Sequence, residues 1–147
     1  MKITIEKFVN SDINTVWNTW NNPEDIKQWN AASDDWHTTE SRVDLREGGE
    51  FSARMEAKDG SMGFDFGGTY TRVVPQELID FKLTDERTVR VEFAVQDDGT
   101  YITETFDAEN ENDPELQRQG WQSILDAFAR HVEASTARRA NLEIELS

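Results

Sequence analysis

The sequence predicts an α+β fold in which one curved antiparallel β-sheet wraps around a long C-terminal α-helix. Most of residues 1–112 alternate apolar and polar side chains between tight turns, which is typical of antiparallel strands. From Trp121 onward the apolar residues instead recur at the spacing of a single helical face, and such a face must be covered. The simplest assembly is one sheet around this helix. The function then depends on whether the enclosed space is filled or hollow.

The N-terminal part predicts one strand and two short helices. Residues 2–9 alternate as a half-buried strand. Residues 10–12 are good helix caps, and apolar residues follow at helical spacing as far as Trp20. Pro23 restarts a second helix, which we expect to end at Trp29.

Six consecutive strands are expected before the last helix, joined by turns such as Asp59-Gly60. A loop over residues 30–39 contains Trp36 and His37. The Gly67-Gly68 pair indicates a bulge or a sharp bend that lets the sheet curl. We expect the strands over residues 40–46, 50–58, 64–74, 78–83, 89–95 and 101–107.

The last helix is expected over residues 113–135. Asp113 is a suitable N-cap, and Pro114 fits the first helical position. Residues 1–135 would form a single helix-and-sheet domain. Residues 136–147 lose the helical pattern and are expected to be loosely ordered or docked as an edge strand. The apolar residues of the helix are Leu116, Trp121, Ile124, Leu125, Phe128 and Val132.

Composition excludes several classes of partner. The 147 residues carry a formal net charge of −15, which argues against nucleic acid and anionic membranes. There is no cysteine, so disulfides, thiol nucleophiles and cysteine-based metal sites are excluded. The sequence has no secretory signal, apolar run of membrane length, phosphate-binding loop or zinc motif. We therefore expect a cytoplasmic protein with no metal, cofactor or membrane insertion.

The order of elements resembles the helix-grip fold of the START-like (SRPBCC) superfamily, and within it the bacterial proteins related to the activator of Hsp90 ATPase homologue 1. The resemblance covers nearly the whole chain to about Ser135 and depends on the order and spacing of several short motifs, beginning with the Val16-Trp17 helix and with Trp29 at the end of the second helix. It implies a cavity between sheet and long helix that accepts apolar ligands, but no shared reaction. The motifs are Val43-Asp44-Leu45-Arg46-Glu47-Gly48-Gly49-Glu50-Phe51, Gly68-Thr69-Tyr70, Val74-Pro75-Gln76-Glu77-Leu78-Ile79 and Gly120-Trp121.

A set of mainly aromatic side chains would face this space. Such a set either lines a ligand pocket or fills a solid core, and composition alone does not separate the two. The candidate ligand-binding residues are Trp36, Met55, Phe64, Phe66, Phe81, Phe93, Trp121, Leu125 and Phe128.

Two residues are candidates for acid–base chemistry. Glu104 shares a strand face with Ile102 and Phe106, so it either points into the apolar space or, on the opposite assignment, lies in water. His37 is either an acid or base at the cavity mouth or an ordinary surface histidine. His131 is interpreted as a flank of the packed helical stripe.

The leading hypothesis is a binding protein for a small apolar or aromatic molecule. One alternative is an Hsp90-activator-like interaction domain with a chaperone partner. Another is a cyclase-type enzyme that uses a pocket carboxylate. The sequence leaves open whether the chain is a monomer or a dimer.

Overall fold

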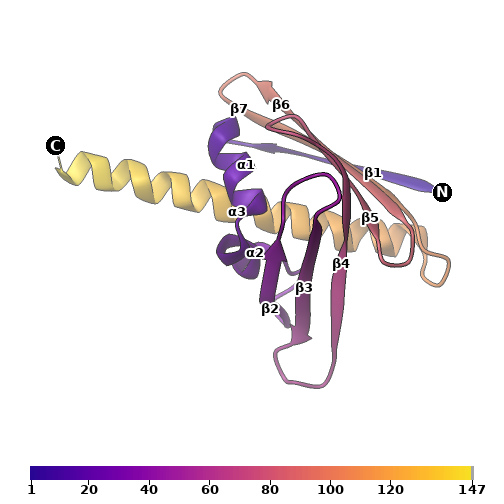
Figure 1. The fold of residues 1–147 in the computed structure, drawn as a ribbon. Coiled ribbons are helices and arrows are strands. Elements are labelled where there is room, and N and C mark those ends of the chain that lie inside the picture. Colours follow the sequence, from indigo (N-terminus) through magenta and orange to yellow (C-terminus); the bar gives the residue numbers. More distant parts are fainter. Residues whose placement is uncertain (147) are drawn as a thin grey trace.

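A seven-stranded antiparallel sheet curls around a long helix in the computed structural model, which describes residues 1–146 (Figure 1). The strand order is β1-β7-β6-β5-β4-β3-β2, and this α+β helix-grip architecture confirms the predicted fold. The helices are α1 (Ile13–Asn21), α2 (Pro23–Trp29) and α3 (Pro114–Leu146). The strands are β1 (Lys2–Val9), β2 (Trp36–Val43), β3 (Glu50–Ala57), β4 (Gly63–Val74), β5 (Leu78–Leu83), β6 (Thr88–Gln96) and β7 (Gly99–Asp107).

The first two helices connect the two opposite edges of the sheet. β1 pairs with β7 at one edge, and β2 pairs only with β3 at the other. Both helices begin at a side-chain cap, since Asp12 accepts the backbone N–H of Thr15 and Asn22 accepts those of Glu24 and Asp25. The predicted bounds of β1, α1 and α2 are confirmed.

β2 and β4 differ from the prediction. β2 begins at Trp36, inside the expected loop, and its alternation is interrupted by a register shift between Thr38 and Glu40. The bulge expected at Gly67-Gly68 lies instead between Tyr70 and Arg72. The glycine is needed for close strand packing: a Cβ at Gly68 would lie 2.2 Å from a backbone oxygen of β5.

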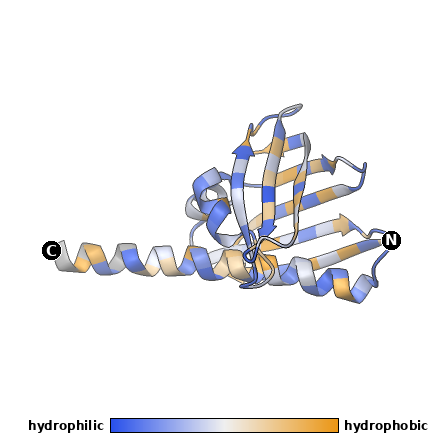
Figure 2. Ribbon diagram, turned by 90° about the horizontal axis from the view of Figure 1, so that it is seen from below, coloured by the Kyte–Doolittle hydropathy of each residue, from blue (hydrophilic) through white to orange (hydrophobic). Residues whose placement is uncertain are grey.

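α3 begins as predicted and ends later than predicted. Asp113 accepts the Glu115 backbone N–H at 2.8 Å, which confirms the N-cap. The helix continues to Leu146, so residues 136–146 extend it and do not form an edge strand. This part projects beyond the sheet (Figures 1 and 2). At the other end, Leu116 is 60% exposed and lies outside the buried stripe.

The core lies where α1 and α2 meet the sheet and the middle of α3. Trp20 packs edge-on against Phe93 and Phe128, with ring centroids 5.7 and 4.9 Å apart. Ile102 and Phe106 of β7 are fully buried beside this cluster. Figure 2 shows apolar and polar residues alternating along the strands. No helix in the part of the chain described here has the length and apolarity needed to cross a membrane.

Candidate functional site

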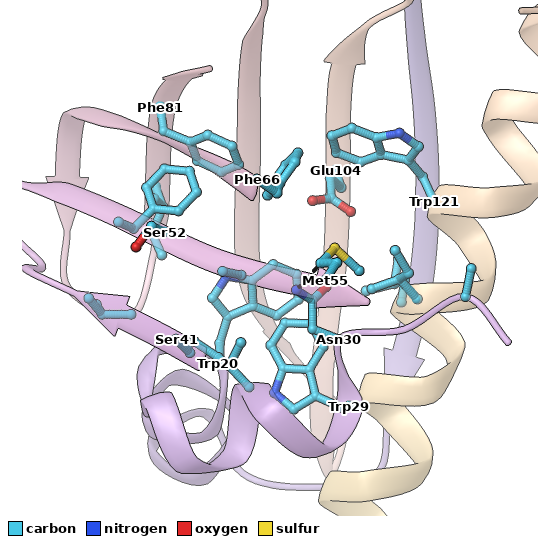
Figure 3. Close-up of a pocket in the computed structure, with 18 of the residues that line it drawn as sticks. Trp20, Trp29, Asn30, Ser41, Ser52, Met55, Phe66, Phe81, Glu104 and Trp121 are labelled. Carbon is cyan, nitrogen blue, oxygen red and sulfur yellow. Dashed lines mark hydrogen bonds between the residues drawn. The ribbon is translucent and has the colours of Figure 1, made fainter. Parts of the chain in front are cut away.

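The sheet and α3 enclose a cavity of about 470 Å³. This volume lies within the range of about 300–1,000 Å³ that is common for small-molecule sites. Most of the lining side chains are apolar or aromatic, and they come from both sides of the grip (Figure 3). The principal lining residues are Trp20, Ile26, Trp29, Trp36, Val43, Phe51, Ala53, Met55, Phe64, Phe66, Tyr70, Ile79, Phe81, Glu104, Gln117, Gly120, Trp121, Ile124 and Leu125.

The strand wall follows from the period-two alternation of β3, β4 and β5. Phe51 and Met55 of β3 face inward on the predicted side of that strand. The Phe51 ring contacts Tyr70 and Phe81, with centroids 5.1 and 4.8 Å apart. These contacts across β3, β4 and β5 hold the aromatic rings in a fixed wall.

The helix wall is one face of α3. Gln117, Gly120, Trp121 and Ile124 have helical spacing and all line the cavity. Gln117 is fixed because its amide nitrogen donates to the Asn112 carbonyl at 2.8 Å. Trp121 stacks on Phe106, with ring centroids 4.0 Å apart and planes 7° from parallel. A Cβ at Gly120 would have no atom within 4 Å, so the cavity is open at this position.

The third wall comes from α1 and α2 and was missed from the sequence. Trp20 and Trp29 contact each other at a centroid distance of 5.1 Å, and both line the cavity. Their apolar spacing was visible in the sequence, but it indicated only that the helices pack on something. Three tryptophans, Trp17, Trp20 and Trp29, in helices of only nine and seven residues were the signal that could have placed this wall.

Most of the predicted ligand-binding residues line the cavity. Phe64 is 47% exposed and contacts Trp36 at 5.7 Å, so these two rings lie where the cavity reaches the surface. Phe93 and Phe128 are corrections, because they are buried in the solid core behind Trp20. The predicted residues that line the cavity are Trp36, Met55, Phe64, Phe66, Phe81, Trp121 and Leu125.

Glu104 is buried on the inward face of β7. Of the two predicted orientations, in the apolar space or in water, the structure has the first. Only 6% of the residue is exposed. Its carboxylate points into the cavity in the region of Phe66, Met55 and Trp121 (Figure 3). Burial raises the pKa of Glu104 to about 8, because removal from water disfavours the charged carboxylate.

Two other polar side chains at the cavity, those of Arg87 and Gln117, are engaged with groups of the protein. Arg87 donates to Asp85 at 2.7 Å. The backbone N–H of Glu109 donates to the Gln117 side chain at 2.9 Å. Burial, with a smaller contribution from Asp44, raises the pKa of Tyr70.

The two histidines lie away from Glu104. His37 is on β2, opposite Glu56 in the register, and does not line the cavity. His131 Nε2 lies 2.9 Å from Asp25 Oδ1, so it joins α3 to α2. Within residues 1–146 there is no group of three or more His, Asp or Glu side chains that could bind a metal ion.

Comparison with known proteins identifies the family. The family model for Activator of Hsp90 ATPase homolog 1-like protein matches residues 10–133. An AHSA1-like protein from Aeromonas hydrophila, solved by NMR, is 54% identical, with a TM-score of 0.88 over 92% of this chain and 94% of its own. A protein from Cytophaga hutchinsonii is 45% identical, with a TM-score of 0.79 and the same coverage of both chains.

A more distant crystal structure shares the fold alone. This protein from Nitrosomonas europaea is 20% identical, with a TM-score of 0.79 over 93% of this chain and 97% of its own. The search of curated proteins finds no match. Because the family model covers most of the chain, this protein belongs to the Activator of Hsp90 ATPase homolog 1-like family.

Proposed function

We propose that this protein binds a small molecule with an apolar or aromatic body in the cavity between the sheet and α3. The observation that carries the proposal is the 470 Å³ cavity lined mainly by apolar and aromatic side chains. A well-packed protein interior leaves few voids larger than a water molecule. A space of this size is therefore unusual for a solid core and typical of a ligand site.

The position of the aromatic rings supports the same function. Phe51, Phe66 and Phe81 form one wall and are in contact through a chain of ring pairs, with Phe51 within 6.2 Å of Phe66 and 4.8 Å of Phe81. Trp121 faces them from α3, with its centroid 6.2 Å from that of Phe66. Flat apolar molecules gain stacking contacts and lose water between such walls.

The proposal is tested by titration with N-phenyl-naphthylamine, a neutral dye whose fluorescence rises in apolar surroundings. We expect saturable binding of one dye per chain, accompanied by quenching of tryptophan fluorescence. A Trp121→Phe variant should retain dye binding and lose part of the tryptophan signal. A correctly folded wild-type protein that gives no saturable dye signal would contradict the proposal.

A further inference from the structure

The Glu104 carboxylate is a polar group within the cavity that has no protein partner. Among the described residues, no side chain or backbone group forms a hydrogen bond or ion pair with it. In the described part of the chain, every side-chain nitrogen or oxygen atom that is fully enclosed by protein has a hydrogen-bond partner. Because the oxygen atoms of Glu104 have no such partner, they are not fully enclosed, and they face the open space of the cavity.

The positions around Glu104 in the sheet are apolar. Ile5 of β1 and Val91 of β6 lie opposite it in the register, and Ile102 and Phe106 precede and follow it on the same face of β7. A buried carboxyl without a partner is costly, and native proteins pair such groups. Because the surrounding strand positions are apolar, a partner for this carboxyl would reach it from the cavity.

The cavity also has features that favour a cation. Trp121 and Phe66 lie on either side of the Glu104 carboxylate in the view of Figure 3. Aromatic faces attract ammonium groups through the charge distribution of the ring. The net charge of −15 attracts cations to the protein as a whole.

The remaining charged side chains at the cavity do not neutralise Glu104. Arg87 is paired with Asp85, and Arg42 is exposed on β2. Of the described α3 side chains, those that line the cavity are Gln117, Gly120 and apolar residues. The other titratable side chains that line the cavity are Arg42, Tyr70, Arg87 and Glu109.

On the basis of the proposed function, we propose that the ligand carries an amine, and that this amine binds the Glu104 carboxylate while its apolar or aromatic body contacts the ring walls. The ammonium N–H groups donate to the carboxylate oxygens. In the free protein at neutral pH the carboxyl group is protonated, because burial raises its pKa to about 8. Binding of the ammonium form releases this proton to the solvent, so the bound pair is carboxylate and ammonium.

The test uses three compounds that share one ring system and differ in the polar group: naphthylmethylamine, naphthylmethanol and naphthoic acid. Each compound competes with N-phenyl-naphthylamine for the wild-type protein. At pH 8 we expect the amine to bind at least tenfold more tightly than the alcohol, and the acid to bind most weakly. Between pH 8 and pH 6 the amine should lose roughly 50-fold in affinity. With a carboxyl pKa of about 8, Glu104 is almost entirely protonated at pH 6 and must lose its proton before it can pair with the ammonium group. The alcohol should change only a few-fold.

Two variants assign the effect to one carboxylate. Glu104→Gln should lose the preference for the amine over the alcohol and the pH dependence of amine binding. Glu109→Gln is the matched control, because it removes another cavity carboxylate and should leave the preference intact. Circular dichroism and the thermal unfolding midpoint check that each variant is folded, independently of binding in the cavity.

The outcomes separate the inference from the proposed function. If the wild-type protein binds the dye but does not prefer the amine to the alcohol, the amine inference is overturned and the binding function stands. If Glu104→Gln keeps the preference, the inference is overturned as well. If the wild-type protein binds neither dye nor competitor, the proposed function itself is refuted.

Discussion

A leucine at position 120 should close the cavity and stabilise the protein at the same time. Gly120 lies on the cavity face of α3 between Gln117 and Ile124, and an added Cβ there meets no atom within 4 Å. A glycine inside a helix costs roughly 0.5–1 kcal/mol relative to alanine, because it is the most flexible residue in the unfolded chain. Gly120→Leu removes this cost and projects four carbon atoms into the ligand space.

The magnitude follows from these two contributions. A fully buried leucine gains about 1.5–3 kcal/mol, but this side chain keeps contact with the remaining cavity, so we take only a fraction of that gain. We therefore expect the free energy of unfolding to rise by about 1–2 kcal/mol, which corresponds to an increase in Tm of about 2–8 °C. Because the leucine occupies space that the dye needs, dye affinity should fall at least tenfold.

The assay is thermal unfolding together with N-phenyl-naphthylamine titration. Gln119→Leu is the control, since it adds the same side chain to an exposed position of the same helix and should leave dye affinity unchanged. Wild-type dye affinity in a folded Gly120→Leu protein would show that the dye binds outside the cavity. A lower Tm would show that the space beside Gly120 is not open.

Three further results are expected. Burial raises the pKa of Glu104 from 4.5 to about 8, so the folded state binds the proton more tightly and stability should fall as pH rises from about 4.5 to 8, by at most roughly 1.4 kcal/mol per pH unit. Urea titrations at pH 5 and pH 8 should show this slope in the wild-type protein, and a Glu104→Gln variant with the same slope would contradict it. Phe128→Ala should lower the free energy of unfolding by about 3–5 kcal/mol, because Phe128 is fully buried. Phe66→Ala, at the cavity wall, should lower it by less than about 2 kcal/mol and weaken dye binding several-fold. Equal losses of stability in urea titrations of the two variants would refute this distinction. Truncation after Ala137 should leave dye affinity unchanged and change the free energy of unfolding by less than about 1 kcal/mol, because Leu142 in the removed part is 55% exposed. A large decrease in Tm would indicate that the removed segment packs tightly.

The fold was predictable because its signals are local. The alternation of β3 to β7 and the helical stripe after Trp121 each follow from the burial of one face. The end of α3 was not predictable from the same signal. Residues 136–146 form helix without an apolar stripe, so a search for a buried face ends near Ser135 although alanine, arginine and glutamate favour helix. The start of β2 was predicted at residue 40 instead of Trp36 for a related reason, because the register shift after Thr38 breaks the alternation.

The site was predictable in part. Periodicity identified which side of a strand faces inward, and this placed Met55, Phe66 and Phe81. It could not tell cavity wall from solid core along one face. Phe93 shares its face of β6 with other buried residues, but Trp20 covers it. That distinction depends on how two helices lie across the sheet, which is a tertiary property.

The pairing of β1 with β7 has a consequence for how the protein folds. Lys2 binds Asp107 across 105 residues of sequence, whereas β2 to β7 form successive hairpins from neighbouring segments. Contacts over such separations form late, because a long loop must close before they contribute any stability. The hairpins can therefore assemble while β1 is still unpaired. The described lining of the cavity includes residues of β2 to β5, Glu104 of β7 and one face of α3, but no residue of β1, so closure of the cavity depends on the docking of α3 and not on the late pairing of β1.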